Sequence, residues 1–354
     1  MDRIDPLSAG ASAPAHRAAA HPGGASSGRE APVAGEPFIA ADVGGTHARI
    51  GRVRIDRTGR VELLEHRRYA CAGYPSLAAI LREFAGSAMP DHAVVAIAGR
   101  LAGDRLVNSN LAWPVSLQQT REAAGIARLA LLNDFGAVAH AVPHLDPATM
   151  TPVCGPHSAV PERGPALVLG PGTGLGAALH LPGPPPQVLA SEAGHAALAA
   201  GSPRELAVLG ELLQRWPHVD NERVLSGPGL VNAYLALCRL DGVAPRLHTP
   251  AAITAPALGG GGRVAVGRRS LFCGVSGRLA GDLAVTFGAG RGYLAGGVLA
   301  NIGPFLRESR FAERFTNKGV FAEALGQVPV WLLDHGQIGL VGAAAWYAAQ
   351  QAGK

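Results

Sequence analysis

The chain has 354 residues, of which 48% are hydrophobic and 16% charged, and its formal net charge is +5. This length and apolar content allow a large core and favour two domains over one. The basic residues are dispersed without interleaved aromatic residues, which argues against a nucleic-acid partner. The apolar runs fall far short of the roughly 20 residues that cross a bilayer, so no membrane span is expected. The N-terminus lacks the continuous apolar stretch of a secretory signal, so we expect a cytoplasmic protein.

The first half of the chain is predicted to be a tail followed by an α/β segment. Residues 1–36 contain no aromatic residue and are rich in Ala, Gly, Ser and Pro, a composition typical of a disordered tail. Strands are predicted at Phe38–Val43 and Ala48–Arg54 around a Gly44–Gly45 turn, which makes a β-hairpin. The next predicted elements are a helix at 77–84 with Ser76 as N-cap, a strand at 94–98, a helix at 116–126 and a strand at 129–132.

The second half repeats that opening after a proline-containing connection at 143–165. Strands predicted at 167–169 and 175–181 enclose a glycine turn at Gly170–Gly174, so the strand, turn and strand pattern occurs twice. Two such hairpins indicate two related α/β lobes that face a cleft. The remaining predicted elements are helices at 203–215, 228–240 and 264–287, strands at 293–298 and 328–333, a helix at 340–351, and a surface loop at Gly259–Gly262.

Four cysteines are widely separated in the sequence. Cys71, Cys154, Cys238 and Cys273 form none of the closely spaced pairs that metal and redox sites use. We therefore expect reduced and mostly buried thiols.

The two glycine turns are candidates for binding phosphate groups. At the first turn, glycine allows the backbone to approach phosphate oxygens, and Asp42 is placed to hold Mg²⁺ through water. At the second turn, backbone N–H groups and the Thr173 hydroxyl are the candidate donors. Either turn alone also fits an ordinary hairpin, but two in order with an acid between them favour phosphate binding. The candidate residues are Asp42, Gly44, Gly45 and Thr46 at the first turn, and Gly170, Gly172, Thr173 and Gly174 at the second.

Polar residues elsewhere form a candidate sugar site. Asn133 and Asp134 follow a buried strand, at the end where open α/β folds gather ligand groups. Asp134 is the candidate general base and Asn133 a contact for a sugar hydroxyl; alternatively, both cap the following helix. Carboxylates that accept two hydrogen bonds suit a ring of hydroxyls. Further candidate contacts are Glu192, His195 and Glu222, together with Asn108 and Ser109 in the polar loop before Trp113. The alternatives are a surface pair for Glu222 with Arg223, and a buried, satisfied imidazole for His195.

In this order, the motifs resemble those of the bacterial glucokinase family, which belongs to the hexokinase and actin superfamily. The resemblance runs from about residue 38 to residue 349. It adds an adenosine motif at Leu294–Val298, with Gly296 and Gly297 as nucleotide contacts. The segments that carry it are Asp42–Thr46, Leu131–Phe135, Gly170–Gly176, Glu192–His195, Glu222–Leu230 and Leu294–Val298.

The resemblance implies a two-domain α/β protein of the actin and hexokinase type, with a ribonuclease H-like fold and an interdomain cleft. We expect a small domain of residues 37–143 plus 338–354 and a large domain of residues 144–337. The implied activity is transfer of the γ-phosphoryl group of ATP, with Mg²⁺, to the 6-hydroxyl of glucose, giving glucose 6-phosphate and ADP. A homodimer is expected. The alternatives are a kinase for another hexose, such as mannose or an amino sugar, and a non-catalytic sugar sensor. Asp134 and the lack of a helix-turn-helix pattern before Phe38 disfavour the sensor.

Overall fold

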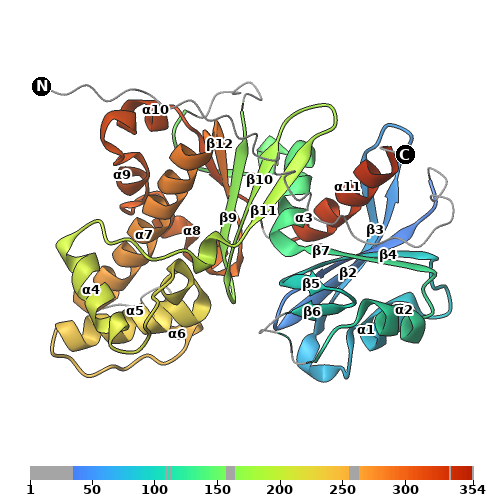
Figure 1. Ribbon diagram of the computed structural model, residues 1–354, viewed down its shortest axis with the longest axis horizontal. Helices are drawn as coiled ribbons and strands as arrows, with labels where there is room; N and C mark the ends of the chain where they lie inside the picture. The colour runs from blue at the N-terminus through green and yellow to red at the C-terminus, as the bar shows by residue number, and fades with distance from the viewer. Residues whose placement is uncertain are drawn as a thin grey trace, which may run out of the picture.

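Two β-sheets with matching strand order organise the chain. The computed structural model describes residues 35–107, 111, 113–156, 164–254, 263–334 and 336–352. Most of the predicted tail, Asn108, Ser109 and the Gly259–Gly262 run lie outside the described residues. Figure 1 shows the two sheets side by side with helices packed around each.

The first sheet has the strand order β3-β2-β1-β4-β7. Its first three strands form an antiparallel meander, and β4 and β7 continue it in parallel with β1. The predicted opening hairpin is confirmed, because β1 pairs with β2 from Phe38 opposite Val53 to Val43 opposite Ala48. The strands are β1 (Phe38–Val43), β2 (His47–Ile55), β3 (Val61–Ala70), β4 (His92–Ile97) and β7 (Arg128–Asn133), and a small ribbon is formed by β5 (Arg100–Ala102) and β6 (Arg105–Val107).

The second sheet has the order β11-β10-β9-β12-β13-β8 and repeats the first. An antiparallel meander of β9, β10 and β11 is followed by β12 and β13, which are parallel to β9. The predicted repetition of the hairpin is therefore confirmed, and it extends to all five strands of the first sheet. The strands are β8 (Thr151–Cys154), β9 (Ala166–Pro171), β10 (Leu175–Leu181), β11 (Gln187–Ser191), β12 (Arg291–Leu294) and β13 (Val330–Leu332).

Helices cover both faces of each sheet. On the first sheet, α1 buries Leu77, Ile80, Leu81 and Phe84, the predicted apolar stripe, and the Ser76 hydroxyl caps it by accepting the N–H of Ala79 at 3.2 Å. One face of the second sheet carries the largest core cluster, to which α4, α5, α7, α8 and α9 contribute. The helices are α1 (Leu77–Ala85), α2 (Leu117–Ala124), α3 (Asp134–Ala141), α4 (Pro203–Leu213), α5 (Gly227–Leu240), α6 (Pro250–Thr254), α7 (Arg263–Phe287), α8 (Gly297–Leu306), α9 (Phe311–Thr316), α10 (Ala322–Gly326) and α11 (Ile338–Ala352).

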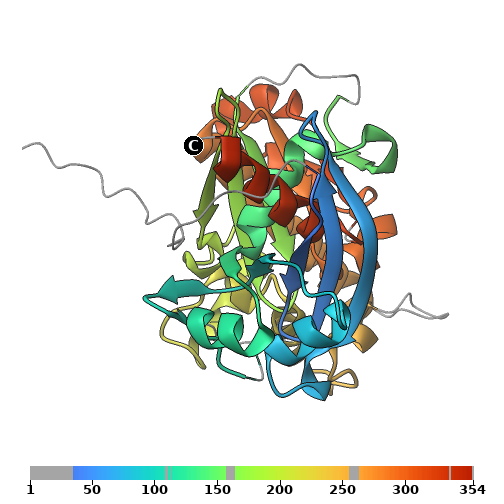
Figure 2. The same cartoon turned by 90° about the vertical axis from the view of Figure 1, so that its right-hand side faces the viewer.

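Two helices, α3 and α11, join the sheets. The C-terminal helix α11 returns to the first sheet and packs on β1, β2 and β4, while α3 contacts β9 and β10 of the second sheet. Figure 2 views the molecule from the side of the first sheet, where the dark red helix α11 runs beside the blue strands. The two helices approach closely, because a side chain at Gly342 would overlap the carbonyl oxygen of Ala137.

Several elements differ from the sequence prediction. The strand expected at 293–298 ends at Leu294, and Gly297 begins α8 instead. The reason is Gly296, whose φ of +95° turns the chain and brings it against the carbonyl oxygen of Pro171. The connection expected at 143–165 contains β8, which pairs antiparallel with β13. Strands β3 and β11 and helices α3, α6, α8, α9 and α10 were not predicted from the sequence.

The four cysteines are free, as predicted, and three of them are buried. Among the described helices, none combines the length and the hydropathy that a bilayer-spanning segment requires.

Candidate functional site

The proposed base lies at the junction of β7 and α3. Asn133 ends the strand, and its side-chain oxygen accepts the N–H of Gly136 at 2.9 Å, so Asn133 is the N-cap of α3. Asp134 is the first helical residue, and its Oδ1 accepts the N–H of Phe135 at 2.9 Å. The capping alternative is thus confirmed for Asn133, and it does not exclude a catalytic role for the neighbouring Asp134.

The electrostatic surroundings of Asp134 suit proton transfer. Burial raises the pKa of Asp134 from its usual 3.8 to about 6; the Phe135 N–H opposes this rise, while the charges of Asp42 and Glu192 add to it. Both of these carboxylates therefore lie within electrostatic reach of Asp134. Since a general base works best when its pKa approaches the working pH, Asp134 is suited to accept a proton near neutrality.

The first glycine turn connects β1 and β2. The N–H of Gly44 donates to the His47 carbonyl at 2.9 Å, and Cys71 supports the turn by donating its thiol to the Gly44 carbonyl at 3.5 Å. Asp42 precedes the turn, and its carboxylate lies 3.5 Å from the Arg49 guanidinium. Burial lowers the pKa of His47, as do the nearby charges of Arg68 and Arg49. Two cationic side chains, Arg49 and Arg68, therefore lie near this turn, which suits a site for phosphate groups.

The second glycine turn is shorter than predicted. It spans residues 172–174, because Gly170 lies in β9 and faces Gly176 of β10 in the antiparallel register. The Gly172 N–H donates to the Gly174 carbonyl at 2.7 Å, and the Gly172 carbonyl accepts the N–H of Gly227 at 2.8 Å. A Cβ at Gly172 would meet no atom within 4 Å, so the turn is open on that side to a ligand.

Glu222 is bound to the second turn. Its Oε2 accepts the N–H of Leu175 at 2.8 Å, and a side chain at Gly174 would lie 2.6 Å from the same oxygen. The structure thus brings a predicted sugar contact directly beside a predicted phosphate turn. Its other oxygen, Oε1, is further from the turn, at 3.7 Å from the same Cβ position.

The segment that carries Glu192 and His195 is held beside Glu222 by Asn221. The buried amide of Asn221 donates to the carbonyls of Ala193 at 3.2 Å and Ala196 at 3.0 Å. His195 itself is 60% exposed, and its Nδ1 lies 3.6 Å from Asp220. The alternative of a buried imidazole is therefore wrong for His195. Sequence reasoning assigned no role to Asp220 or Asn221, although both directly precede Glu222 in the chain.

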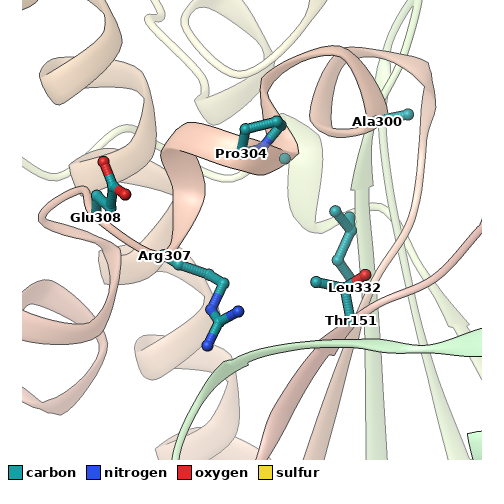
Figure 3. Close-up of a pocket in the computed structure, with 7 residues that line it drawn as sticks. Thr151, Ala300, Pro304, Arg307, Glu308 and Leu332 are labelled. Carbon is teal, nitrogen blue, oxygen red and sulfur yellow. The ribbon is translucent and has the colours of Figure 1, made fainter. Parts of the chain in front are cut away.

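The predicted nucleotide contacts Gly296 and Gly297 start α8. Gly296 packs against the second hairpin, since a Cβ there would lie 2.5 Å from the Pro171 carbonyl oxygen, whereas Gly297 has open space. Further along α8 lies a pocket of about 680 Å³, shown in Figure 3. It is lined by Thr151, Ala300, Gly303, Pro304, Arg307, Glu308 and Leu332. None of the predicted site residues lines this pocket, so it is separate from the candidate site.

The described residues contain no group of three or more His, Cys, Asp or Glu side chains able to enclose a metal ion. Mg²⁺ in kinases is usually held by one or two carboxylates together with substrate phosphates, so a single carboxylate beside a phosphate site can serve it. Asp42 fits this role, since its carboxylate is 19% exposed and lies at the phosphate turn.

Comparison with known proteins identifies a single family over most of the chain. The family model described as Glucokinase matches residues 39–350. A glucokinase-like protein of Xylella fastidiosa (strain Temecula1) is 44% identical over 322 residues, which cover 89% of this chain and 96% of that protein. A glucokinase of Zymomonas mobilis is 38% identical over 316 residues, covering 88% and 97% of the two chains.

The fold is matched among solved structures as well. The crystal structure of a glucokinase from an Antarctic psychrotroph superposes with a TM-score of 0.76 at 34% identity. The match covers 88% of this chain and 98% of that one. The predicted fold class, a two-sheet α/β fold of the actin and hexokinase type, is confirmed.

Proposed function

Because the chain belongs to the glucokinase family, we propose that it transfers the γ-phosphoryl group of ATP to the 6-hydroxyl of glucose with Asp134 as the base. The protein is an enzyme, a glucose kinase. The observation that carries the residue assignment is the Asp134 carboxylate, held at the start of α3 with a raised pKa and with Asp42 and Glu192 nearby.

Phosphoryl transfer depends mainly on how the reacting groups are positioned. Phosphoryl transfer proceeds through a loose transition state with little covalent work for the protein, so alignment and charge stabilisation dominate. Asp134 would accept the proton of the 6-hydroxyl as the bond to phosphorus forms. The other hydroxyls would be held by Asn133 Nδ2, Glu192, His195 and Glu222. Two further proposed contacts are Asn108 and Ser109.

The donor would lie across the two glycine turns. Phosphate oxygens would be held by the backbone N–H groups of residues 45–46 and 173–174 and by the hydroxyls of Thr46 and Thr173. Gly44 and Gly172, whose N–H groups donate within the turns, would let the backbone approach the phosphates closely, and Gly296 and Gly297 would contact the adenosine. Bound Mg²⁺ neutralises phosphate charge, and Asp42 would hold it through water. The charges of Arg49 and Arg68 near the first turn support the binding of phosphate there.

We propose two domains, residues 37–143 plus 338–354 and residues 144–337, that close on glucose. The packing of α11 on the first sheet supports this division. Closure would exclude water and align the 6-hydroxyl with the donor. Small-angle scattering with and without glucose is expected to show compaction, and an unchanged radius of gyration would contradict the hinge. We also propose that the protein is cytoplasmic and that it forms a homodimer. Sedimentation of the purified protein tests the homodimer.

A coupled assay with several sugars and donors tests the function. Glucose, mannose and glucosamine are each offered with ATP and with polyphosphate. We expect glucose with ATP to give the highest kcat/KM. A higher kcat/KM for mannose or glucosamine would reassign the sugar, and turnover only with polyphosphate would reassign the donor.

A further inference from the structure

The ring of Phe135, which the proposed mechanism does not use, lies on a pair of glycines. Gly170 of β9 and Gly176 of β10 face each other in register. A Cβ at Gly170 would lie 2.5 Å from Cζ of Phe135, and one at Gly176 would overlap the ring at Cδ2. Both distances are shorter than real Cβ contacts, so any side chain at either glycine would displace the ring. Only glycine at both positions leaves room for it.

This contact joins the two sheets. Phe135 is the second residue of α3, which continues from β7 of the first sheet, whereas both glycines belong to the second sheet. Phe135 packs against a core cluster that includes Val138 of its own helix and the second-sheet residues Ala166 and Val168. The start of α3 is thereby fixed relative to the β9–β10 hairpin.

The hairpin carries this constraint to the second phosphate turn. Beyond the glycine pair comes only one more register pair, Pro171 with Leu175, before the turn at 172–174. Hydrogen bonds from Gly172 to Gly174 and from Leu175 to Glu222 hold the turn rigidly on the hairpin. A shift of the glycine pair would therefore move the turn with it.

The same residue also holds the base, since the Phe135 N–H donates to Asp134 Oδ1 at 2.9 Å. Phe135 thus contacts the base through its backbone and the phosphate hairpin through its ring. We propose that Phe135 is a positioning residue for phosphoryl transfer, whose ring on the Gly170–Gly176 pair sets the distance between Asp134 and the second phosphate turn. This inference rests on the proposed role of Asp134 as the base.

The proposal predicts a loss of turnover without a matching loss of substrate binding. Misplacing a catalytic group by about 1 Å can cost about 10²-fold in rate. We therefore expect Phe135→Leu and Gly176→Ala each to lower kcat between about tenfold and a hundredfold. In Phe135→Leu the KM for glucose should change by less than about threefold, because the proposed sugar contacts other than Asn133 and Asp134 lie on other segments. In Gly176→Ala it should change less than kcat, because only Glu222 among those other contacts is bound to the turn that moves.

The pH dependence of kcat separates positioning from stability. Burial raises the pKa of Asp134, whereas the Phe135 N–H lowers it. A shift of Phe135 disturbs both contributions, so the acid limb of the kcat profile should move in Phe135→Leu. Two controls match the changes: Phe311→Leu, at a fully buried core phenylalanine, and Gly210→Ala, at a glycine with open space around it.

Phe135→Ala and Gly176→Ala also form a double-mutant cycle. Phe135→Ala removes Cγ and Cδ2, the ring atoms that a methyl group at position 176 would overlap, so the double variant should lose less in kcat than the product of the two single losses. Fully multiplicative losses would overturn the contact. If Phe135→Leu lowers the melting temperature like Phe311→Leu but keeps kcat and its acid limb, the positioning role is refuted. The Asp134→Asn variant, assayed alongside, reports separately on the proposed function: if it keeps turnover, the base assignment fails instead.

Discussion

The replacement Asp134→Asn separates catalysis from stability at the centre of the site. It nearly preserves the shape of the side chain and removes the proton acceptor. Positioned acid–base catalysis contributes about 10² to 10⁴-fold, so kcat should fall at least about a hundredfold. Glucose binding should largely survive, because the amide oxygen still accepts a hydrogen bond and Glu192 and Glu222 are unchanged.

The stability of the same variant is expected to rise. Raising the pKa of the Asp134 carboxyl from 3.8 to about 6 favours its protonated form in the folded protein by about 3 kcal/mol. At pH 7 the carboxyl is ionised, so the folded state is destabilised by about this amount relative to the unfolded chain. A neutral asparagine avoids that cost and the repulsion from Asp42. The variant should therefore unfold at a higher temperature than the parent, by a few degrees at pH 7.

The pH dependence of this gain has a definite sign. The folded protein holds the Asp134 proton up to about pH 6, whereas the unfolded chain releases it near pH 3.8, so the contribution of Asp134 to stability falls as the pH rises between these values. The advantage of Asp134→Asn should therefore be largest above pH 6 and vanish below about pH 4.

Two measurements on Asp134→Asn check this reasoning: steady-state kinetics with glucose and ATP, and calorimetric melting temperatures at pH 4 and pH 7. In the parent enzyme, kcat should fall below about pH 6, because the base becomes protonated. Turnover within a few-fold of the parent would show that Asp134 is not the base. A lower melting temperature at pH 7 would show that burial does not disfavour the carboxylate.

The remaining predictions address the sugar contacts, the tail and the helix crossing. Glu192→Gln and Glu222→Gln each remove a charge-assisted acceptor worth about 1.5–3 kcal/mol, so the glucose KM should rise at least about tenfold; an unchanged KM would remove that residue from the site. The ATP KM should rise only in Glu222→Gln, because Glu222 alone accepts the Leu175 N–H at the second turn. A chain that begins at Glu36 should keep kcat and both KM values within about twofold, and lost activity would give residues 1–35 a role. Gly342→Ala should lower the free energy of unfolding by about 1–3 kcal/mol through its clash with Ala137. In the same denaturant unfolding, Gly210→Ala should raise it by about 0.5–1 kcal/mol, because Gly210 is an exposed position inside α4 with open space around it.

The features that could be predicted from the sequence are those determined by residues close together along the chain. The Ser76 cap and the apolar stripe of α1 are encoded within ten residues, and the structure confirms both. The two strand, turn and strand segments were predicted because short apolar runs on either side of glycine turns are local signals. Even there, the second turn proved shorter than expected, since strand pairing extends to Pro171 and Leu175.

Three of the four edge strands of the two large sheets, β3, β8 and β11, escaped prediction. Strand β3 is mostly exposed and polar, so its sequence lacks the apolar alternation that marks a half-buried strand. Its place is fixed instead by the pairing of its backbone with β2 and by cross-strand ion pairs such as Arg54 with Glu62. Strand β8 was hidden within a proline-containing stretch, and it becomes a strand by pairing with β13, far along the chain.

The sequence by itself determined the family, the duplicated hairpins and most of the candidate residues, because motif order, turn glycines and helix caps are written in short stretches of chain. Only the tertiary structure decided what several of those residues do. Gly170 was predicted to approach phosphate, yet its missing side chain makes room for Phe135, 35 positions earlier in the chain. Glu222 meets the second turn through a hydrogen bond that spans 47 positions. The raised pKa of Asp134 depends on burial and on charges from two other segments. Contacts between distant segments, and the desolvation they cause, exist only once the chain is packed, and no local pattern records them.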